Sequence, residues 1–229
     1  MMVGVLLAAG ASTRMGRPKA LLARGRESWI AHGIRNLWSA CDDVVVVLGA
    51  GAQGIRGRTV EEFERLVGSE SFGRDLKAAQ RHHADRLEVR FVVNRAWRRG
   101  MLSSARAGLR AALRYQPSAV VVLPVDHPAL RRATVLDLAT VMAQALHADH
   151  TQKRARRGAA RAAFSYALVP RFRRRRGHPV VLSAALARAV AADAGAEDLS
   201  DAIRRNARLV GYLDVKDPGV TRNVNRPGE

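Results

Sequence analysis

An apolar run near the start of the chain, Val3 to Ala8, restricts the possible folds more than any other stretch. It has the length and composition of a strand that is buried on both faces of a parallel sheet. The loop that follows, as far as Lys19, combines small residues with glycines and cationic side chains. Gly10 and Gly16 let the backbone turn sharply, and the small neighbours leave backbone N–H groups open as an anion-binding concavity. We therefore predict a buried strand that leads into a polyphosphate-binding loop.

The cationic residues and the glycine spacing of this loop can be compared with those of known phosphate-binding motifs. Arg14 and Lys19 would add full positive charge to the backbone N–H groups. A Walker A loop has four residues between its glycines and then Lys-Ser/Thr, whereas five residues separate Gly10 from Gly16 here and Arg17-Pro18 follows. The loop also lacks the G-x-G-x-x-G pattern of dinucleotide-binding proteins. It therefore matches neither of these two motifs.

Apolar runs and helical patterns alternate along the rest of the 229-residue chain. We predict strands at Asp43–Leu48, Leu87–Val93, Ala119–Leu123, Tyr166–Val169 and Leu209–Val215, and helices at Glu27–Ala40, Val60–Val67, Phe72–His83, Thr134–His147, Ala184–Ala192 and Leu199–Asn206, with another helix opened by Ser103-Ser104. Thr134 and one of the two serines are expected to cap their helices. The alternation predicts a single Rossmann-like α/β domain over residues 1–229, with a mostly parallel central sheet flanked by helices and a helical insertion at 55–86.

An acidic residue stands at the end of the fourth predicted strand. Asp126 follows the run Ala119–Leu123, within the sequence Pro124-Val125-Asp126-His127-Pro128. Open α/β sheets bind their ligands beyond the carboxyl ends of their strands. If this strand and Val3–Ala8 are parallel members of one sheet, Asp126 and the phosphate loop lie at the same edge.

A second glycine motif supports a different class of protein. Gly49, Gly51 and Gly54 form a literal G-x-G-x-x-G directly after the strand Asp43–Leu48, as in nicotinamide- or flavin-dependent oxidoreductases. In those proteins an apolar helix comes next, and the following strand ends in an acid. Here the stretch Ile55 to Arg65 is strongly charged, which does not predict such a helix. An oxidoreductase remains an alternative to a phosphate-transferring enzyme.

The charge balance raises nucleic-acid binding as another alternative. The formal net charge is +19, from 39 basic and 20 acidic residues, a balance that is typical of nucleic-acid-binding proteins. Only four of the basic residues are lysines, which indicates a chain-wide bias toward arginine. The aromatic residues that would stack on single-stranded bases make up only 5% of the chain. We expect no specific nucleic-acid partner.

The remaining composition bears on the location of the protein. The single Cys41 excludes an intrachain disulfide and a cysteine metal cluster. No apolar run approaches the roughly 18 residues of a transmembrane helix. The N-terminus lacks the charged region of a signal peptide. We expect a cytoplasmic protein without a membrane partner.

The phosphate loop and several later blocks resemble the MobA-like nucleotidyltransferases, a family that includes the molybdenum cofactor cytidylyl- and guanylyltransferases. The loop matches the family signature LAAGxSxRMGxxK at Leu7-Ala8-Ala9-Gly10, Ser12, Arg14-Met15-Gly16 and Lys19. Later stretches resemble the NPxWxxGMxSS block at Asn94–Ser104, the metal-binding acid block at Pro124–Pro128, the RGHPV block at Arg176–Val180 and the closing N-V-N-T-P block at Asn223–Pro227. The long segment 55–86 and Arg226, in place of the usual threonine, depart from the family pattern.

The resemblance implies transfer of a nucleoside monophosphate from a nucleoside triphosphate to a phosphate-bearing acceptor, with release of pyrophosphate. It implies that Mg²⁺ is bound by Asp126, with Asn225 as a second contact. It also implies that the catalytic residues are Arg14, Lys19 and Asp126. The implied nucleotide-binding residues are Leu7, Ala8, Ala9, Gly10, Arg14, Lys19 and Ser104, and the implied acceptor-binding residues are His178 and Pro179.

The identities of the base and the acceptor follow from finer features of the resemblance. Ala9 stands where guanylyl-transferring members tend to have glycine, which implies CTP rather than GTP. The acceptor implied is molybdopterin, with a sugar or polyol phosphate left open. A molybdoenzyme or a chaperone is a further partner that the family suggests.

Overall fold

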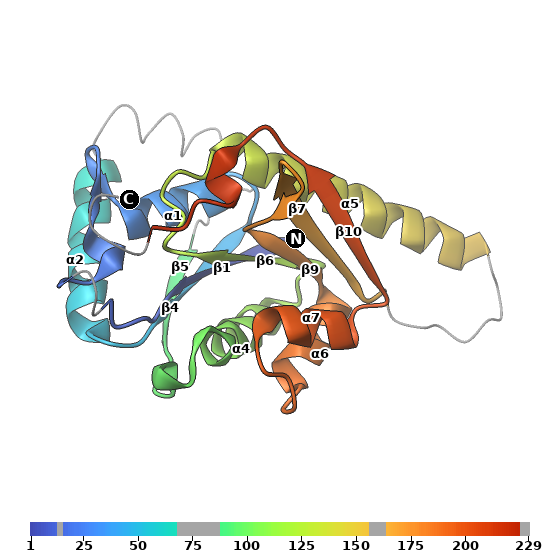
Figure 1. The fold of residues 1–229 in the computed structure, drawn as a ribbon, viewed down its shortest axis with the longest axis horizontal. Helices are drawn as coiled ribbons and strands as arrows, with labels where there is room; N and C mark the ends of the chain where they lie inside the picture. The colour runs from blue at the N-terminus through green and yellow to red at the C-terminus, as the bar shows by residue number, and fades with distance from the viewer. Residues whose placement is uncertain (13–15, 68–87, 156–163, 225–229) are drawn as a thin grey trace.

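The computed structural model describes residues 1–12, 16–67, 88–155 and 164–224 (Figure 1). Two of the predicted site residues, Arg14 and Asn225, therefore lie outside the described residues. The predicted helix Phe72–His83 lies outside them as well.

One sheet runs through the described residues, and it is mostly parallel, as predicted. Its strands follow in the order β10-β7-β9-β6-β1-β4-β5, and the short β8 pairs with β7 at its end. Only β8 and β9 run antiparallel to their neighbours. The bounds are β1 Met2–Ala8, β4 Asp43–Leu48, β5 Glu88–Val93, β6 Ala119–Pro124, β7 Tyr166–Phe172, β8 Arg175–Arg176, β9 Val180–Ser183 and β10 Leu209–Asp214. A separate small hairpin is formed by β2 Ala23–Arg24 and β3 Glu27–Ser28.

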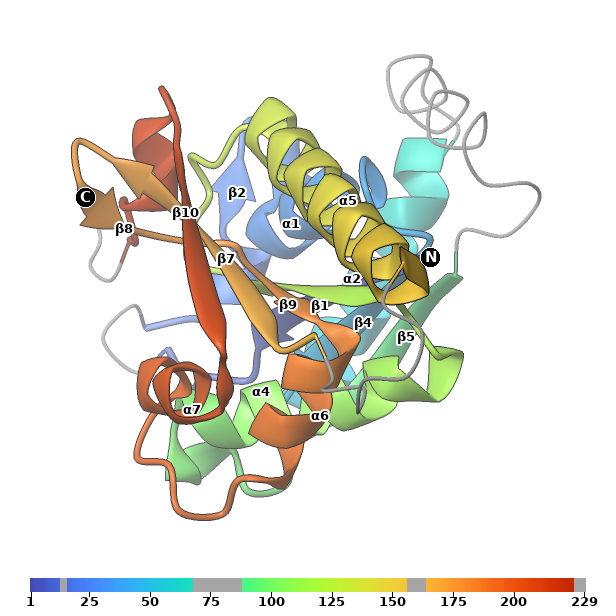
Figure 2. The same cartoon turned by 90° about the vertical axis from the view of Figure 1, so that its right-hand side faces the viewer.

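Helices cover both faces of the sheet (Figures 1 and 2). On one face lie α1 Trp29–Trp38, α2 Ala52–Val67 and α5 Arg132–Ala155, and on the other lie α4 Met101–Ala112, α6 Ala184–Ala192 and α7 Leu199–Asn206. Short 3₁₀ helices are η2 Lys19–Leu21, η3 Trp97–Arg99, η4 Leu113–Tyr115 and η5 Pro218–Val220. The predicted α/β architecture is confirmed by this arrangement.

The two-sided burial of the sheet explains the uninterrupted apolar run of β1. Along this strand successive side chains point to opposite faces. Leu6 packs into the core beneath α1 and α5, while Val5 packs into the core beneath α4 and α6. β1 pairs in parallel with β4 on one side and with β6 on the other. The carboxyl ends of β1 and β6 therefore meet at one edge, as predicted for the phosphate loop and Asp126.

Several predicted helix starts were wrong. Helix α2 begins at Ala52, directly after Gly51 with φ of 65°, and not at Val60. Helix α5 begins at Arg132 and continues to Ala155. Thr134 does not cap it, because this residue lies within the first turn and its hydroxyl donates to Asp217. Tertiary hydrogen bonds of this kind have no signature in local sequence.

No helix of the described residues is long and apolar enough to cross a membrane. Cys41 is fully buried, and this burial raises the pKa of its thiol well above the ordinary range. The cysteine is therefore a core residue.

Candidate active site

A pocket of about 390 Å³ lies at the carboxyl ends of β1 and β6. It is bounded by the loop after β1, the start of η2, the loop after β6 and the η3–α4 turn. The predicted site residues that line it are Leu7, Ala8, Ala9, Gly10, Lys19, Ser104 and Asp126. Ile55, Trp97 and Met101, which were not predicted as site residues, line the same pocket. The structure thus brings together three blocks that are distant in sequence.

Lys19 and Asp126 face each other in this pocket. The ammonium Nζ of Lys19 lies 3.8 Å from Oδ2 of Asp126, and the two side chains are 15% and 25% exposed. The Lys19 backbone N–H donates to the Ser12 hydroxyl at 2.9 Å, so the ends of the loop are joined across residues 12–19. Asp126 follows Val125, whose N–H donates to the Leu7 carbonyl at 3.0 Å. A cation and a carboxylate are therefore held open to an anionic ligand and its counterion.

The η3–α4 turn is organised by Asn94, a buried residue that sequence reasoning did not select. Its Nδ2 donates to the hydroxyls of Ser103 at 2.9 Å and Ser104 at 3.0 Å. Neither serine caps α4, because Gly100 occupies the N-cap position without a side-chain hydrogen bond. Ser103 donates instead to the Ala96 and Gly100 carbonyls. The capping prediction was wrong, and both hydroxyls belong to a network that places Ser104 at the pocket.

The G-x-G-x-x-G stretch has a packing role at the same edge of the sheet. A Cβ on Gly49 would lie 2.4 Å from the Ala9 carbonyl oxygen and 2.7 Å from Cβ of Trp97. The Ala50 N–H donates to the same Ala9 carbonyl at 3.2 Å. In contrast, a Cβ on Gly54 would have no atom within 4 Å. A side chain at position 49 would collide with the loop after β1, so this position requires glycine. The third glycine of the motif, Gly54, has no neighbouring atom that would exclude a side chain.

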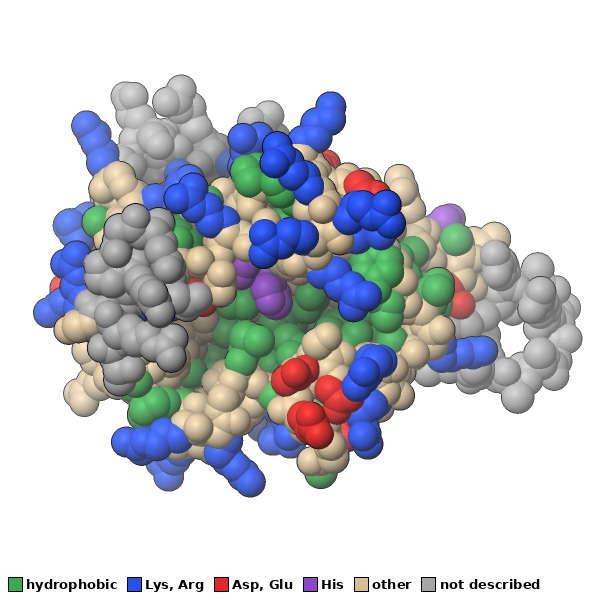
Figure 3. All heavy atoms as spheres, in the orientation of Figure 1, with side chains coloured by type: hydrophobic (Ala, Val, Ile, Leu, Met, Phe, Trp, Pro, Cys, Tyr) green, Lys and Arg blue, Asp and Glu red, His purple; other side chains and the backbone are tan. Residues whose placement is uncertain are grey.

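His178 and Pro179 do not line this pocket, but they are linked to Asp126 through His127. The His127 and His178 rings meet edge to face, with centroids 5.1 Å apart. His127 is buried, with Nδ1 3.1 Å from the Gly219 carbonyl oxygen and Nε2 3.9 Å from Oδ1 of Asp126. Figure 3 shows histidine side chains in the hollow at the middle of this face.

The imidazole of His178 is uncharged at neutral pH. Burial, and secondarily the neighbouring His127, lowers the pKa of His178 to about 4. Its Nδ1 is shielded from solvent and has no hydrogen-bond partner among the described residues. Its backbone N–H donates to the Val220 carbonyl at 2.8 Å, which attaches the β8–β9 connection to η5. A substrate group beside His178 would therefore meet a neutral imidazole.

The arginine run before His178 forms a hairpin. Arg171 pairs with Asp214 at 2.8 Å, whereas Arg173 to Arg176 are exposed at the β7–β8 turn. Figure 3 shows basic side chains gathered along one border of the hollow. This border attracts anions.

Among the residues that the structure describes, no three His, Cys, Asp or Glu side chains are grouped to hold a metal ion. A protein site for Mg²⁺ often supplies only one or two carboxylates, and substrate phosphates and water supply the rest. The partly exposed Asp126 carboxylate at the phosphate loop fits that pattern.

Comparisons with known proteins agree on the family and the fold. The sequence model of one family, described as the MobA-like NTP transferase domain, matches residues 4–209. The nicotine blue oxidoreductase of Paenarthrobacter nicotinovorans is 35% identical over 228 residues, which cover 97% of this chain and 91% of that protein.

Solved structures show the same fold at lower identity. Rv0371c from Mycobacterium tuberculosis superposes with a TM-score of 0.65 at 20% identity, covering 98% of this chain and 93% of that chain. A complex of the same mycobacterial protein with manganese gives 0.56 at 21% identity, covering 93% and 88%. Molybdopterin-guanine dinucleotide biosynthesis protein A from Archaeoglobus fulgidus gives 0.53 at 18% identity, covering 99% and 93%.

Proposed function

The chain belongs to the MobA-like NTP transferase family, and we propose that it transfers a nucleoside monophosphate from CTP to a phosphate-bearing acceptor. One observation carries this proposal, the approach of Lys19 Nζ to within 3.8 Å of Asp126 Oδ2 beside the glycine-containing loop. A partly exposed ion pair contributes little to folding stability, so we assign these two charges to ligand binding. If a triphosphate and its metal counterion bind here, the Lys19 ammonium can pair with a phosphate and the Asp126 carboxylate can pair with the metal ion.

In the proposed reaction an oxygen of the acceptor phosphate attacks the α-phosphorus of the nucleotide. A new phosphorus–oxygen bond forms as the bond to the bridging oxygen breaks, and pyrophosphate leaves with that electron pair. Phosphoryl-type transfer depends mainly on positioning and on neutralising charge. Loop N–H groups and Lys19, together with Arg14, would hold the triphosphate. An ionised phosphate is already deprotonated, so the proposed attack needs no general base.

Asp126 would hold Mg²⁺, with Asn225 as the second protein contact. A bound divalent ion offsets negative charge on the phosphates during transfer. The protein's part is to present the Asp126 carboxylate toward the loop. Val125 and Val224 support this, because they tie the backbone around Asp126 to β1 and to the segment after η5.

Ser104 and Ala9 would contact the base. The Ser104 oxygen already accepts from Asn94, so its O–H is available to donate to a ring nitrogen or carbonyl of cytosine. Ala9 is 4% exposed, and its carbonyl is engaged by Ala50. In this proposal the Cβ of Ala9 would occupy space that a larger purine needs.

We propose molybdopterin as the acceptor, with a sugar or polyol phosphate as the other possibility, and a molybdoenzyme or chaperone as the protein partner. The support comes from the RGHPV-like block, in which His178 and Pro179 follow the arginine hairpin. The neutral His178 would bond to the uncharged part of an acceptor. The exposed arginines would attract its phosphate.

A second candidate function is reduction by a nicotinamide dinucleotide. The observation in its favour is the 35% identical relative that is named an oxidoreductase. The Ala9 carbonyl and Trp97 occupy the space beside Gly49 in the glycine motif. For this candidate we therefore place the dinucleotide at the Leu7–Gly10 loop of the same pocket.

Two assays on the purified protein distinguish these functions. One follows pyrophosphate release from CTP and Mg²⁺ with a panel of phosphorylated acceptors. The other follows oxidation of NADH or NADPH with nicotine blue as the electron acceptor. Acceptor-dependent pyrophosphate release supports the transferase. Oxidation of NADH or NADPH without any pyrophosphate release would overturn the transferase proposal in favour of the second candidate.

A further inference from the structure

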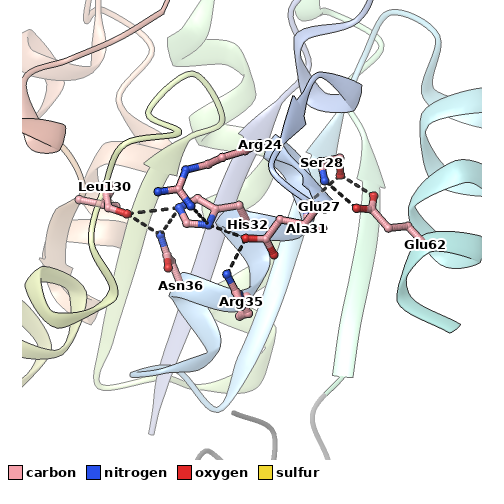
Figure 4. Close-up of polar contacts among 9 residues, drawn as sticks. All are labelled: Arg24, Glu27, Ser28, Ala31, His32, Arg35, Asn36, Glu62 and Leu130. Atoms are coloured by element: carbon pink, nitrogen blue, oxygen red, sulfur yellow. Dashed lines mark hydrogen bonds and ion pairs between the residues drawn. The ribbon is translucent and has the colours of Figure 1, made fainter. Parts of the chain in front are cut away.

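A buried polar network joins α1 to the loop that carries Asp126 (Figure 4). His32 and Asn36 lie one helical turn apart on α1 and are only 5% and 3% exposed. Asn36 Nδ2 donates to the Leu130 carbonyl at 3.0 Å, and His32 Nε2 lies 3.3 Å from the same oxygen. Leu130 is four residues beyond Asp126 and is itself buried. The turn after the proposed metal ligand is therefore attached to α1 through one carbonyl.

One tautomer of His32 allows hydrogen bonds to both Glu27 and Asn36. If His32 carries its proton on Nδ1, it donates to Glu27 Oε1 at 2.9 Å. Nε2 then accepts from Asn36 at 3.0 Å, while the other amide N–H of Asn36 goes to Leu130. The result is a chain of hydrogen bonds from the Glu27 carboxylate to the Leu130 carbonyl. We call His32 and Asn36 the α1 clamp.

His32 also contacts the hairpin that follows Lys19 along the chain. Arg24, on the β2–β3 hairpin, lies with Nη1 3.2 Å from His32 Nδ1. The hairpin follows η2, which begins at Lys19, and the Trp29 N–H donates to the Leu22 carbonyl at 2.9 Å. The α1 clamp thus contacts both the hairpin that follows Lys19 and the turn that follows Asp126.

Polar side chains at these two positions are costly unless they have a specific use. A buried amide or imidazole loses its hydration and must be compensated by hydrogen bonds. The neighbouring inward residues Ile30, Ile34 and Leu37 are fully buried and apolar, so leucine at either clamp position would suit this face of α1 for packing alone. The amide of Asn36 is explained by the Leu130 carbonyl, to which it donates, and the imidazole of His32 is explained by its bonds to the Glu27 carboxylate and the Asn36 amide.

We propose that His32 and Asn36 are positioning residues, which set the place of Asp126 relative to Lys19 and so the affinity of the site for a metal–nucleotide complex. The inference rests on the proposed function, because it assumes that Asp126 binds the metal. Groups that orient a metal ligand from outside its coordination shell typically change metal affinity by about 10- to 100-fold. The α1 clamp acts at one further remove, so we expect about the lower limit of that range.

The test replaces Asn36 with leucine, which has a similar size and cannot donate. Calorimetry measures the affinity of the protein for Mn²⁺–CTP and, separately, for CTP with a chelator. Asn36→Leu should weaken Mn²⁺–CTP binding about tenfold and leave chelated CTP within about twofold of the wild type. The matched control is Asn206→Leu, because Asn206 on α7 also donates twice, to Asp193 Oδ2 at 2.7 Å and to the Ala202 carbonyl at 2.8 Å. The control should lower the melting temperature without changing either affinity.

The outcomes separate the inference from the proposed function. If the wild type binds Mn²⁺–CTP no better than chelated CTP, the metal–nucleotide site itself is refuted. If the wild type shows the metal effect and folded Asn36→Leu binds Mn²⁺–CTP like the wild type, the inference is wrong and the function stands. An equal loss for both ligands would show a general structural effect and would also overturn the inference. Should Asn36→Leu not fold, His32→Leu keeps the Asn36–Leu130 bond and should show a smaller loss confined to Mn²⁺–CTP, and no such loss would refute the inference.

Discussion

Lys19 Nζ and Asp126 Oδ2 lie 3.8 Å apart although they are separated by more than a hundred residues in the sequence. Their meeting follows from the parallel pairing of β1 with β6, which puts Leu7 opposite Pro124. The loop after each strand then leaves the sheet at the same edge. This pair of charges is the centre of the proposed transferase site.

Replacing the carboxylate should affect turnover rather than folding. Asp126 is partly exposed and its side chain contributes little packing, so Asp126→Asn should melt within a few degrees of the wild type. The rate of pyrophosphate release should fall by at least about 10², which is the scale for the loss of a key electrostatic group. Near-normal turnover of the folded variant with Mg²⁺ would show that Asp126 does not bind the metal.

Alanine substitutions at the two ends of the G-x-G-x-x-G stretch should have opposite effects on the stability of the fold. Gly49→Ala places a Cβ against the Ala9 carbonyl and Trp97, so it should destabilise the fold by about 1–3 kcal/mol and weaken CTP binding. Gly54→Ala meets open space within α2 and should stabilise by roughly 0.5–1 kcal/mol. Thermal unfolding and CTP titration measure both. If Gly54→Ala removed nucleotide binding and Gly49→Ala did not, the stretch would be a dinucleotide site.

The pocket could be predicted from the sequence to the extent that it depends on strands and local loops. The apolar runs of β1 and β6 indicate buried parallel strands, and this alone places Lys19 and Asp126 at one edge. Gly10, Ala9 and Ser104 came from the family resemblance, and the structure brings all three to the pocket.

The supporting contacts could not be predicted, because they depend on elements that meet only in the folded chain. Asn94 looks like a turn residue in the sequence, and its bonds to Ser103 and Ser104 require the exact turn at Gly100. His32 and Asn36 look like polar positions on an amphipathic helix until Leu130 is seen beside them. The literal glycine motif has a different basis, since helix α2 does follow Gly49-Ala50-Gly51, but Gly49 serves packing, Gly51 adopts a positive φ and Gly54 meets open space.

Acidification should destabilise the protein through His178. The pKa of this residue is about 4 in the folded protein, below its ordinary value of 6.5. Between these values the unfolded chain binds a proton that the folded chain does not, so stability is fully present above 6.5 and falls as the pH drops toward 4. From neutral pH to about pH 5 the loss should be roughly 2 kcal/mol. Urea unfolding of His178→Gln should lack this part of the pH dependence, and an unchanged dependence would contradict the burial of a neutral imidazole.

The basic surface should bind nucleic acid only through its charge. The exposed Arg173 to Arg176 and a net charge of +19 favour contact with phosphates, and phosphate contacts carry no sequence information. Binding to duplex DNA should be weak and should collapse between about 50 and 200 mM salt. Fluorescence anisotropy with two unrelated duplexes measures this. Tight binding that depends on the sequence at the upper salt concentration would favour a nucleic-acid function.

The choice of base should depend on a single methyl group at Ala9. Its carbonyl packs against Gly49, the residue directly after β4, and accepts from the Ala50 N–H at 3.2 Å, so the loop cannot withdraw easily to admit a purine. A methyl group in a binding pocket changes discrimination by about 1–3 kcal/mol, or roughly 10- to 200-fold. We expect kcat/KM for CTP to exceed that for GTP by about this factor. Ala9→Gly should narrow the ratio mainly by improving GTP, and Ser104→Ala should narrow it by weakening CTP. Equal kcat/KM for the two nucleotides in the wild type would refute the cytidylyl assignment and leave nucleotidyl transfer intact.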